Sequence, residues 1–145
     1  MSALLRQSKP AFAMLTIFLA ACAIFNMGDM NKEVVVTLSG ANEVPPVTTS
    51  ASGAGTIFVA ADKSISGIIT TTGVAGTAAH IHVGAAGKNG PVIVPLARSG
   101  AGGWSVPPGT RITDAQFESF KHGELYVNVH SEANKGGEIR GQLTP

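Results

Sequence analysis

The sequence contains very little cysteine and little charge. One cysteine among 145 residues excludes an intramolecular disulfide and any zinc or iron–sulfur site built from several cysteines. Charged residues make up 13% of the chain and the formal net charge is +1, so we expect no basic surface for nucleic acid. The 18 glycines and 8 prolines are fewer than the roughly 25–30% typical of disordered low-complexity chains. These values indicate one folded domain that does not bind nucleic acid.

Several catalytic patterns are also missing. The sequence has no G-x-S-x-G nucleophile elbow, and its 9 acidic residues are scattered without the pairing that carboxylate catalysis requires. Neither methionine nor cysteine occurs after residue 30, which excludes a blue-copper or thiolate site from the rest of the chain. Hydrolase chemistry based on serine, cysteine or paired carboxylates therefore has no support.

The N-terminal segment has the pattern of a bacterial export signal. A basic start precedes the apolar run Ala11–Phe25, which is shorter than the roughly 18 residues of a membrane-spanning helix. Within it, Leu19–Cys22 (LAAC) resembles a lipobox, in which small residues precede the cysteine that receives lipid. We expect residues 1–21 to be the signal, Cys22 to be lipidated and residues 22–32 to form a tether. The protein would then be a membrane-anchored lipoprotein in the bacterial periplasm or at the cell surface.

From residue 33 onward the pattern indicates β-strands. Short runs rich in β-branched residues are separated by turn-forming residues, as in antiparallel sheets. The expected strands are residues 34–38, 53–60, 65–72, 78–83, 91–97, 125–130 and 138–143. Pro91 and Pro95 mark the fifth of these as an edge strand or an interrupted one. We predict that residues 33–145 form an all-β domain, either an antiparallel sandwich or a barrel.

One short helix is expected near residues 113–122. Thr113 and Gln116 match a capping box, and Phe117 and Phe120 lie three residues apart on the face that would turn toward the core. His122 falls in the last turn, where a cationic side chain suits the helix dipole. We interpret this histidine as a solvent-exposed residue at the helix end and leave it out of any site.

Three other histidines form the candidate metal site. Side chains alternate along a strand, so His80 and His82 share the face opposite Ile81. By the same alternation, His130 leaves its strand on the side opposite the aliphatic residues. If the two strands are neighbours, the three imidazoles can converge as ligands for Cu²⁺ or Zn²⁺. The alternative is that they are surface or hydrogen-bonded histidines with a structural role.

A fourth ligand would complete the coordination of such an ion. Glu43, Glu138 and Tyr126 are the candidates alongside water, and the residue pattern does not choose among them. Gly84–Pro91 follows the strand that carries two of the histidines and contains three glycines. A phosphate-binding loop would require a helix after it, whereas a strand-like run follows, so we interpret this segment as a glycine-rich turn.

Three segments of the β-region resemble the chordin-type (CHRD) domain family, in particular its exported bacterial members. They are Leu38–Pro46 (LSGANEVPP), Ala79–Gly84 (AHIHVG) with the nearby Gly90-Pro91-Val92, and Leu125–His130 (LYVNVH) followed by Gly137–Leu143 (GEIRGQL). The resemblance covers about residues 33–144 and implies an all-β, immunoglobulin-like fold. In animal chordin these domains belong to an extracellular antagonist of bone morphogenetic proteins, a role that we do not carry over to this chain. The resemblance supplies no ligand set.

A weaker resemblance is to Cu,Zn superoxide dismutase, an antiparallel sandwich with a His-x-His pair on a strand. Its copper–zinc pair requires six histidines and an aspartate, whereas this chain has 4 histidines in all. Two functions therefore remain open. One is a non-enzymatic, membrane-tethered module that binds a protein, a surface polymer or a metal ion, and the other is a redox enzyme with a mononuclear copper centre. We favour the non-enzymatic module.

Overall fold

A computed structural model describes residues 31–145 of the chain. The expected export signal, the lipidated Cys22 and most of the expected tether lie outside the described residues. The strands are β1 (Lys32–Ser39), β2 (Ser52–Val59), β3 (Ile65–Thr72), β4 (Gly76–Val83), β5 (Val92–Pro95), β6 (Ala97–Arg98), β7 (Gly103–Ser105), β8 (Leu125–Ser131) and β9 (Ile139–Leu143). A short 3₁₀ helix, η1 (Gly40–Asn42), follows β1, and one α-helix, α1 (Asp114–Lys121), precedes β8.

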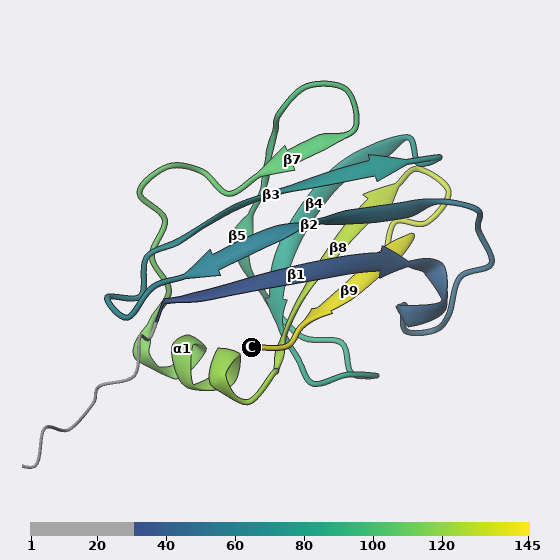
Figure 1. The fold of residues 1–145 in the computed structure, drawn as a ribbon. Helices are drawn as coiled ribbons and strands as arrows, with labels where there is room; N and C mark the ends of the chain where they lie inside the picture. The colour runs from purple at the N-terminus through teal and green to yellow at the C-terminus, as the bar shows by residue number, and fades with distance from the viewer. Residues whose placement is uncertain (1–30) are drawn as a thin grey trace, which may run out of the picture.

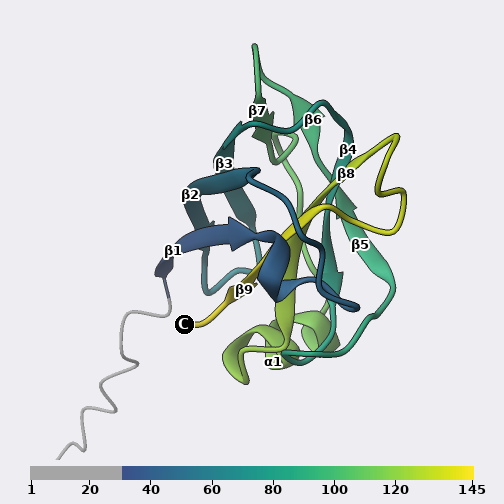
Figure 2. The ribbon, with the colours of Figure 1, turned by 90° about the vertical axis from the view of Figure 1, so that its right-hand side faces the viewer.

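All the strands belong to one sheet that curls almost into a closed barrel (Figures 1 and 2). The strand order is β5-β4-β8-β9-β1-β2-β3-β7-β6, and every pair is antiparallel. The two end strands, β5 and β6, are separated in the chain by Leu96 alone, and the Leu96 N–H donates to the Ala79 carbonyl at 2.9 Å. One extended segment therefore leaves β4 and joins β7, which draws the two ends of the sheet together. The predicted antiparallel all-β fold is confirmed, in its barrel-like form.

The core fills the inside of this curled sheet, because alternate side chains of each strand point inward. Ile81 of β4, Val127 of β8 and Ile139 of β9 are completely buried there, as are Ile57 and Ile69 from the opposite side. The residues between them on β4, β8 and β9 point outward, and the histidines are among these. Burial of the aliphatic set thus fixes which side chains lie on the outer face, since a shift of one residue would turn the whole aliphatic set outward.

The helix has the predicted capping box. The Gln116 N–H donates to Thr113 Oγ1 at 3.2 Å, and the Thr113 N–H donates to Gln116 Oε1 at 2.8 Å. Phe117 and Phe120 are both buried, and α1 lies across one end of the barrel (Figure 1). His122 is exposed, with its ring nitrogen on the carbonyl of its own last turn, as expected for a residue outside any site.

The residue pattern missed the two shortest strands. The segment predicted as one strand over 91–97 divides at Leu96 into β5 and β6, in agreement with the interruption that its prolines suggested. β7 was not anticipated, because its three residues follow Gly100 and Gly102 and show no alternation of their own. Pairing with β3 and β6, rather than local sequence, makes this segment a strand. No helix among the described residues is long and apolar enough to cross a membrane.

Candidate metal centre

The three candidate histidines lie together on the outer face of two neighbouring strands. β4 pairs directly with β8, and the register places His80 opposite Asn128, His82 opposite Tyr126 and Ala78 opposite His130. The potential ligand nitrogens of the three histidines all lie within 4.8 Å of one another. Nitrogens bound to one ion at about 2 Å lie up to about 4 Å apart, so small side-chain rotations suffice for joint ligation. We call His80, His82 and His130 the histidine tripod.

Backbone carbonyls fix the orientation of two of these rings. His82 Nδ1 lies 2.9 Å from the Gly90 carbonyl oxygen, and His130 Nδ1 lies 2.9 Å from the Lys135 carbonyl oxygen. A carbonyl can only accept a hydrogen bond, so each Nδ1 carries the proton and each neutral ring keeps its lone pair on Nε2. Metal-ligating histidines characteristically hold their second nitrogen in this way.

The third ring completes the cluster through a contact between histidines. His80 Nδ1 lies 3.0 Å from His130 Nε2. Because His130 Nε2 bears a lone pair, His80 donates its Nδ1 proton to it in the absence of an ion. A metal ion bound here would replace that proton, which would move to Nε2 of His80.

The surroundings of His80 and His82 favour their neutral imidazole forms. Burial lowers the pKa of His80, and the nearby His130 and His82 lower it further, since their positive charges would repel its own. Burial also lowers the pKa of His82, although its hydrogen bond to Gly90 acts in the opposite direction. Neutral imidazole is the form that binds metal ions, so the site is prepared for ligation near neutral pH.

A layer of buried polar residues supports the tripod from the side. The Tyr126 ring is stacked on His82, with ring centroids 4.7 Å apart and an interplanar angle of 6°. Arg140 of β9, the strand on the other side of β8, places its Cζ 3.3 Å from the Tyr126 ring centroid. Arg140 is 1% exposed and donates hydrogen bonds to the carbonyl oxygens of Lys88 (2.8 Å) and Ala85 (3.2 Å). Three strands thus present one continuous stack that ends at the histidine tripod.

The Gly84–Pro91 segment is a turn, as predicted, and it folds over this stack. Besides receiving the hydrogen bonds of Arg140, it gives the Gly90 carbonyl to His82, and the Gly90 N–H donates to the Tyr126 hydroxyl at 3.2 Å. A Cβ at Gly90 would lie 1.6 Å from the Val83 carbonyl oxygen, so only glycine permits this path. The turn therefore orients a candidate metal ligand, a role that the residue pattern did not indicate.

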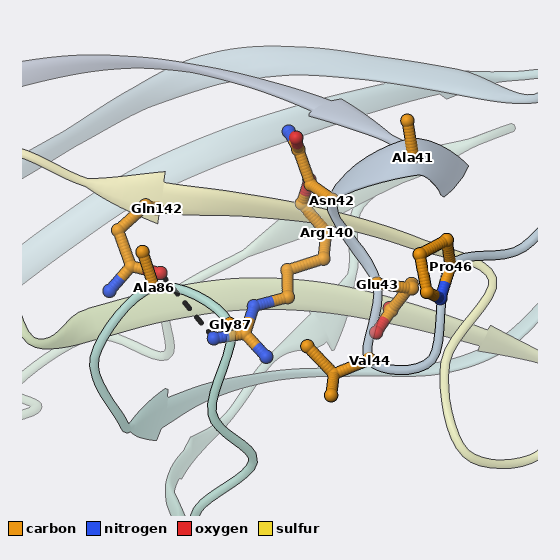
Figure 3. Close-up of a pocket in the computed structure, with 9 residues that line it drawn as sticks. All are labelled: Ala41, Asn42, Glu43, Val44, Pro46, Ala86, Gly87, Arg140 and Gln142. Carbon is orange, nitrogen blue, oxygen red and sulfur yellow. Dashed lines mark hydrogen bonds between the residues drawn. The ribbon is translucent and has the colours of Figure 1, made fainter.

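A cavity of about 490 Å³ opens beside Arg140, between this turn and the segment that follows β1 (Figure 3). Glu43, Arg140, Asn42 and Gln142 lie along it, and small or apolar residues form the rest of its lining. None of the three histidines lines the cavity. In the described part of the chain, the stacked side chains of Tyr126 and Arg140 thus lie between this cavity and the tripod.

Hydrogen bonds from other parts of the chain engage two of the three side chains that the sequence suggested as a fourth ligand. Glu138 accepts hydrogen bonds from Thr49 at 2.8 Å and from Ser131, and hydrogen bonding to Ser131 lowers its pKa despite burial. The Tyr126 hydroxyl accepts from Gly90. Neither Glu43 nor Glu138 belongs to the histidine cluster among residues 31–145. Residues in loops hold the Glu138 carboxylate and the Tyr126 hydroxyl by hydrogen bonds. The alternation of side chains along a strand does not reveal such contacts.

Residues that sequence analysis passed over lie next to the tripod. Asn128 is 2% exposed, is directly opposite His80 in the β4–β8 pair, and has its Nδ2 near Glu43 at Gly137. Glu43 is 4% exposed, and burial raises its pKa. The alternation of residues 125–130 had already placed the Asn128 side chain on the histidine face, which was the available signal. Its burial by two loops could not be read in the same way.

These features define a class of protein: an all-β, barrel-like domain with a histidine cluster on the outer face of two adjacent strands. The model of the CHRD domain matches residues 34–143, so the chain belongs to the CHRD domain family. The expected family membership is thereby confirmed. Comparison with curated proteins and with solved structures found no match.

Proposed function

We propose that this CHRD-domain protein is a non-enzymatic binding module that holds one divalent transition-metal ion, Cu²⁺ in preference to Zn²⁺, on its histidine tripod. The observation that carries the proposal is the convergence of His80, His82 and His130 within 4.8 Å. Two of these rings have their Nδ1 protons held by backbone carbonyls. Nε2 of His82 and Nε2 of His130 bear lone pairs, so the cluster can bind a cation that displaces the His80 Nδ1 proton.

The ligand set supports Cu²⁺ as the preferred ion. Imidazole nitrogens suit both copper and zinc, and at a given nitrogen site Cu²⁺ binds more tightly than the other divalent first-row ions. The described residues contain no cysteine or methionine, the sulfur ligands that would favour Cu⁺. The geometry of the site and the availability of each metal also affect which ion is bound, so Cu²⁺ and Zn²⁺ must be compared directly.

The proposed location is the outer side of a bacterial membrane, with the domain tethered through a lipid on Cys22. Support for this comes from the basic start, the short apolar run and the LAAC segment. β1 begins at Lys32, and the ten residues from Cys22 span at most about 35 Å when fully extended. An anchored domain would therefore remain close to the membrane surface and could collect metal ions there.

Calorimetric titration of the detergent-solubilised full chain with Cu²⁺, and then with Zn²⁺, tests the proposal. We expect one Cu²⁺ per chain, bound more tightly than Zn²⁺. His82→Ala should remove this binding, while His122→Ala, the matched change at the exposed histidine of the helix end, should preserve it. Absence of heat at micromolar copper, or equal loss in both variants, would show that the tripod is structural.

A further inference from the structure

Three buried side-chain atoms beside the tripod have no hydrogen-bond partner among the described residues. They are His82 Nε2, Asn128 Oδ1 and Glu43 Oε1. His82 Nε2 bears a lone pair because Nδ1 carries the proton, and the other two atoms are a carboxamide and a carboxyl oxygen. Together they form a buried group of acceptors without a donor. Buried acceptors without partners are costly, and native structures rarely leave them so without a functional reason. A cation beside His82 and Asn128 would satisfy two of the three.

The orientation of the Asn128 carboxamide follows from its neighbours. Its Nδ2 lies 3.5 Å from the Gly136 carbonyl oxygen. A Cβ at Gly137 would lie 2.7 Å from this nitrogen and 2.3 Å from Glu43 Oε1, so Nδ2 is on the Glu43 side of the carboxamide. The amide nitrogen therefore faces the two acceptors, and the amide oxygen is left for the histidine side.

The strand register places this oxygen next to the tripod. Asn128 is directly opposite His80 in the β4–β8 pair and two residues before His130, so all of them share one face. His82 Nδ1 is protonated by its bond to Gly90, so the lone pair on His82 Nε2 and that on Asn128 Oδ1 are neighbours with no proton between them. We propose that Asn128 Oδ1 is the fourth protein ligand of the metal ion, which would complete a site of three nitrogens and one oxygen. This inference rests on the proposed metal-binding function.

Glu43 then acts through Asn128 as a positioning residue. Its carboxylate lies on the Nδ2 side of the Asn128 amide group, where its negative charge favours the amide nitrogen and leaves Oδ1 facing the histidines. Gly137 makes this approach possible, because a Cβ there would lie 2.3 Å from Glu43 Oε1 and 2.7 Å from Asn128 Nδ2. The Gly137 φ of 134° is also one that other residues rarely adopt. The GANEVPP and GGEIRG segments thus meet at the back of the proposed ligand.

The test is copper binding by full-chain variants, followed by calorimetry and by the electron paramagnetic resonance and visible spectra of the bound Cu²⁺. Asn128→Leu should weaken Cu²⁺ binding by about tenfold or more and change both spectra, because an oxygen ligand is lost. Asn128→Asp keeps an oxygen in place and should bind at least as tightly as the wild type. Glu43→Gln should weaken binding by a smaller factor. Asn42→Leu, the same exchange at an exposed asparagine, should change neither affinity nor spectrum.

A measurement on the unaltered protein guards against a variant that fails to fold. On addition of Zn²⁺, the Asn128 side-chain amide resonances (¹³Cγ and ¹⁵Nδ2) should shift strongly in nuclear magnetic resonance spectra, while those of Asn42 should not. If the wild type binds no metal, the proposed function fails. If it binds one ion but the Asn128 resonances and the Asn128→Leu spectra stay unchanged, this inference alone is wrong, and water fills the fourth position.

Discussion

The Nδ1–H of His82 donates a hydrogen bond to the Gly90 carbonyl at 2.9 Å, and this contact links the glycine-rich turn to the face that carries the histidine tripod. It determines which nitrogen of His82 carries the proton and therefore which one is free to bind an ion. Eight residues separate the two partners in the chain, so the turn after β4 orients a ligand within β4 itself.

The first prediction follows from this contact. Gly90→Ala would place a Cβ about where the Val83 carbonyl oxygen lies, so the turn must move. We expect the free energy of unfolding to fall by about 2 kcal/mol, a usual cost of overpacking. The affinity for Cu²⁺ should fall as well. Urea unfolding and calorimetry measure the two effects. Gly87→Ala is a control for glycine strain alone, since a Cβ at Gly87 would meet no atom within 4 Å. Loss of stability with unchanged copper affinity in Gly90→Ala would argue against a role for the turn in orienting His82.

The second prediction concerns pH. The pKa values of His80 and His82 are lowered in the folded protein from the ordinary 6.5, so the unfolded chain binds protons more readily below that pH. Well above pH 6.5 both histidines are neutral in the folded and the unfolded chain, and their protonation does not affect stability. Below pH 6.5 the unfolded chain binds more protons, so the free energy of unfolding falls as the pH drops. Glu43, whose pKa is raised from 4.5, acts with the opposite sign at pH values above 4.5.

Urea midpoints between pH 8 and pH 5.5, measured without metal, should show this loss. His80→Gln should reduce the slope, because one titrating group and its repulsion with His130 are removed. His122→Gln, the same exchange at a histidine outside the cluster, is the matched comparison. A wild-type midpoint that is constant over this range would contradict the prediction.

The third prediction concerns the helix at the end of the barrel. Thr113→Ala removes the hydroxyl that caps α1 and should cost about 1 kcal/mol. Phe117→Ala should cost more, about 3 kcal/mol, because its ring is buried against the core. Alanine at the exposed Glu118, which pairs only with Lys121 of the same helix face, should change stability by less than about 0.5 kcal/mol. Unchanged urea midpoints for Phe117→Ala would contradict this packing.

The fourth prediction concerns the proposed anchor. In a bacterial host, Cys22→Ser should abolish lipid labelling and leave the precursor unprocessed or soluble. The measurements are incorporation of labelled palmitate, membrane fractionation and the mass of the mature chain. A variant that partitions into membranes and matures like the wild type would argue against a lipoprotein.

Local chemistry made part of this structure predictable. The alternation of residues 79–83 and 125–130 placed two groups of polar side chains on defined strand faces, because a strand turns successive side chains to opposite sides. The capping box of α1 was equally readable, since both of its hydrogen bonds join Thr113 and Gln116, only three residues apart. In each case the determining interaction lies within a few residues.

Only the tertiary structure decided how these parts meet. Pairing of β4 with β8 brings His80 and His130 together across 50 residues, and the strand that changes partner at Leu96 closes the barrel. The burial of Asn128 and the engagement of Glu138 by Thr49 depend on loops folded over the outer face. By itself the sequence determined which side chains share a strand face. Which faces become neighbours, and which polar groups lose their water, was set by long-range strand pairing and by burial of the aliphatic core.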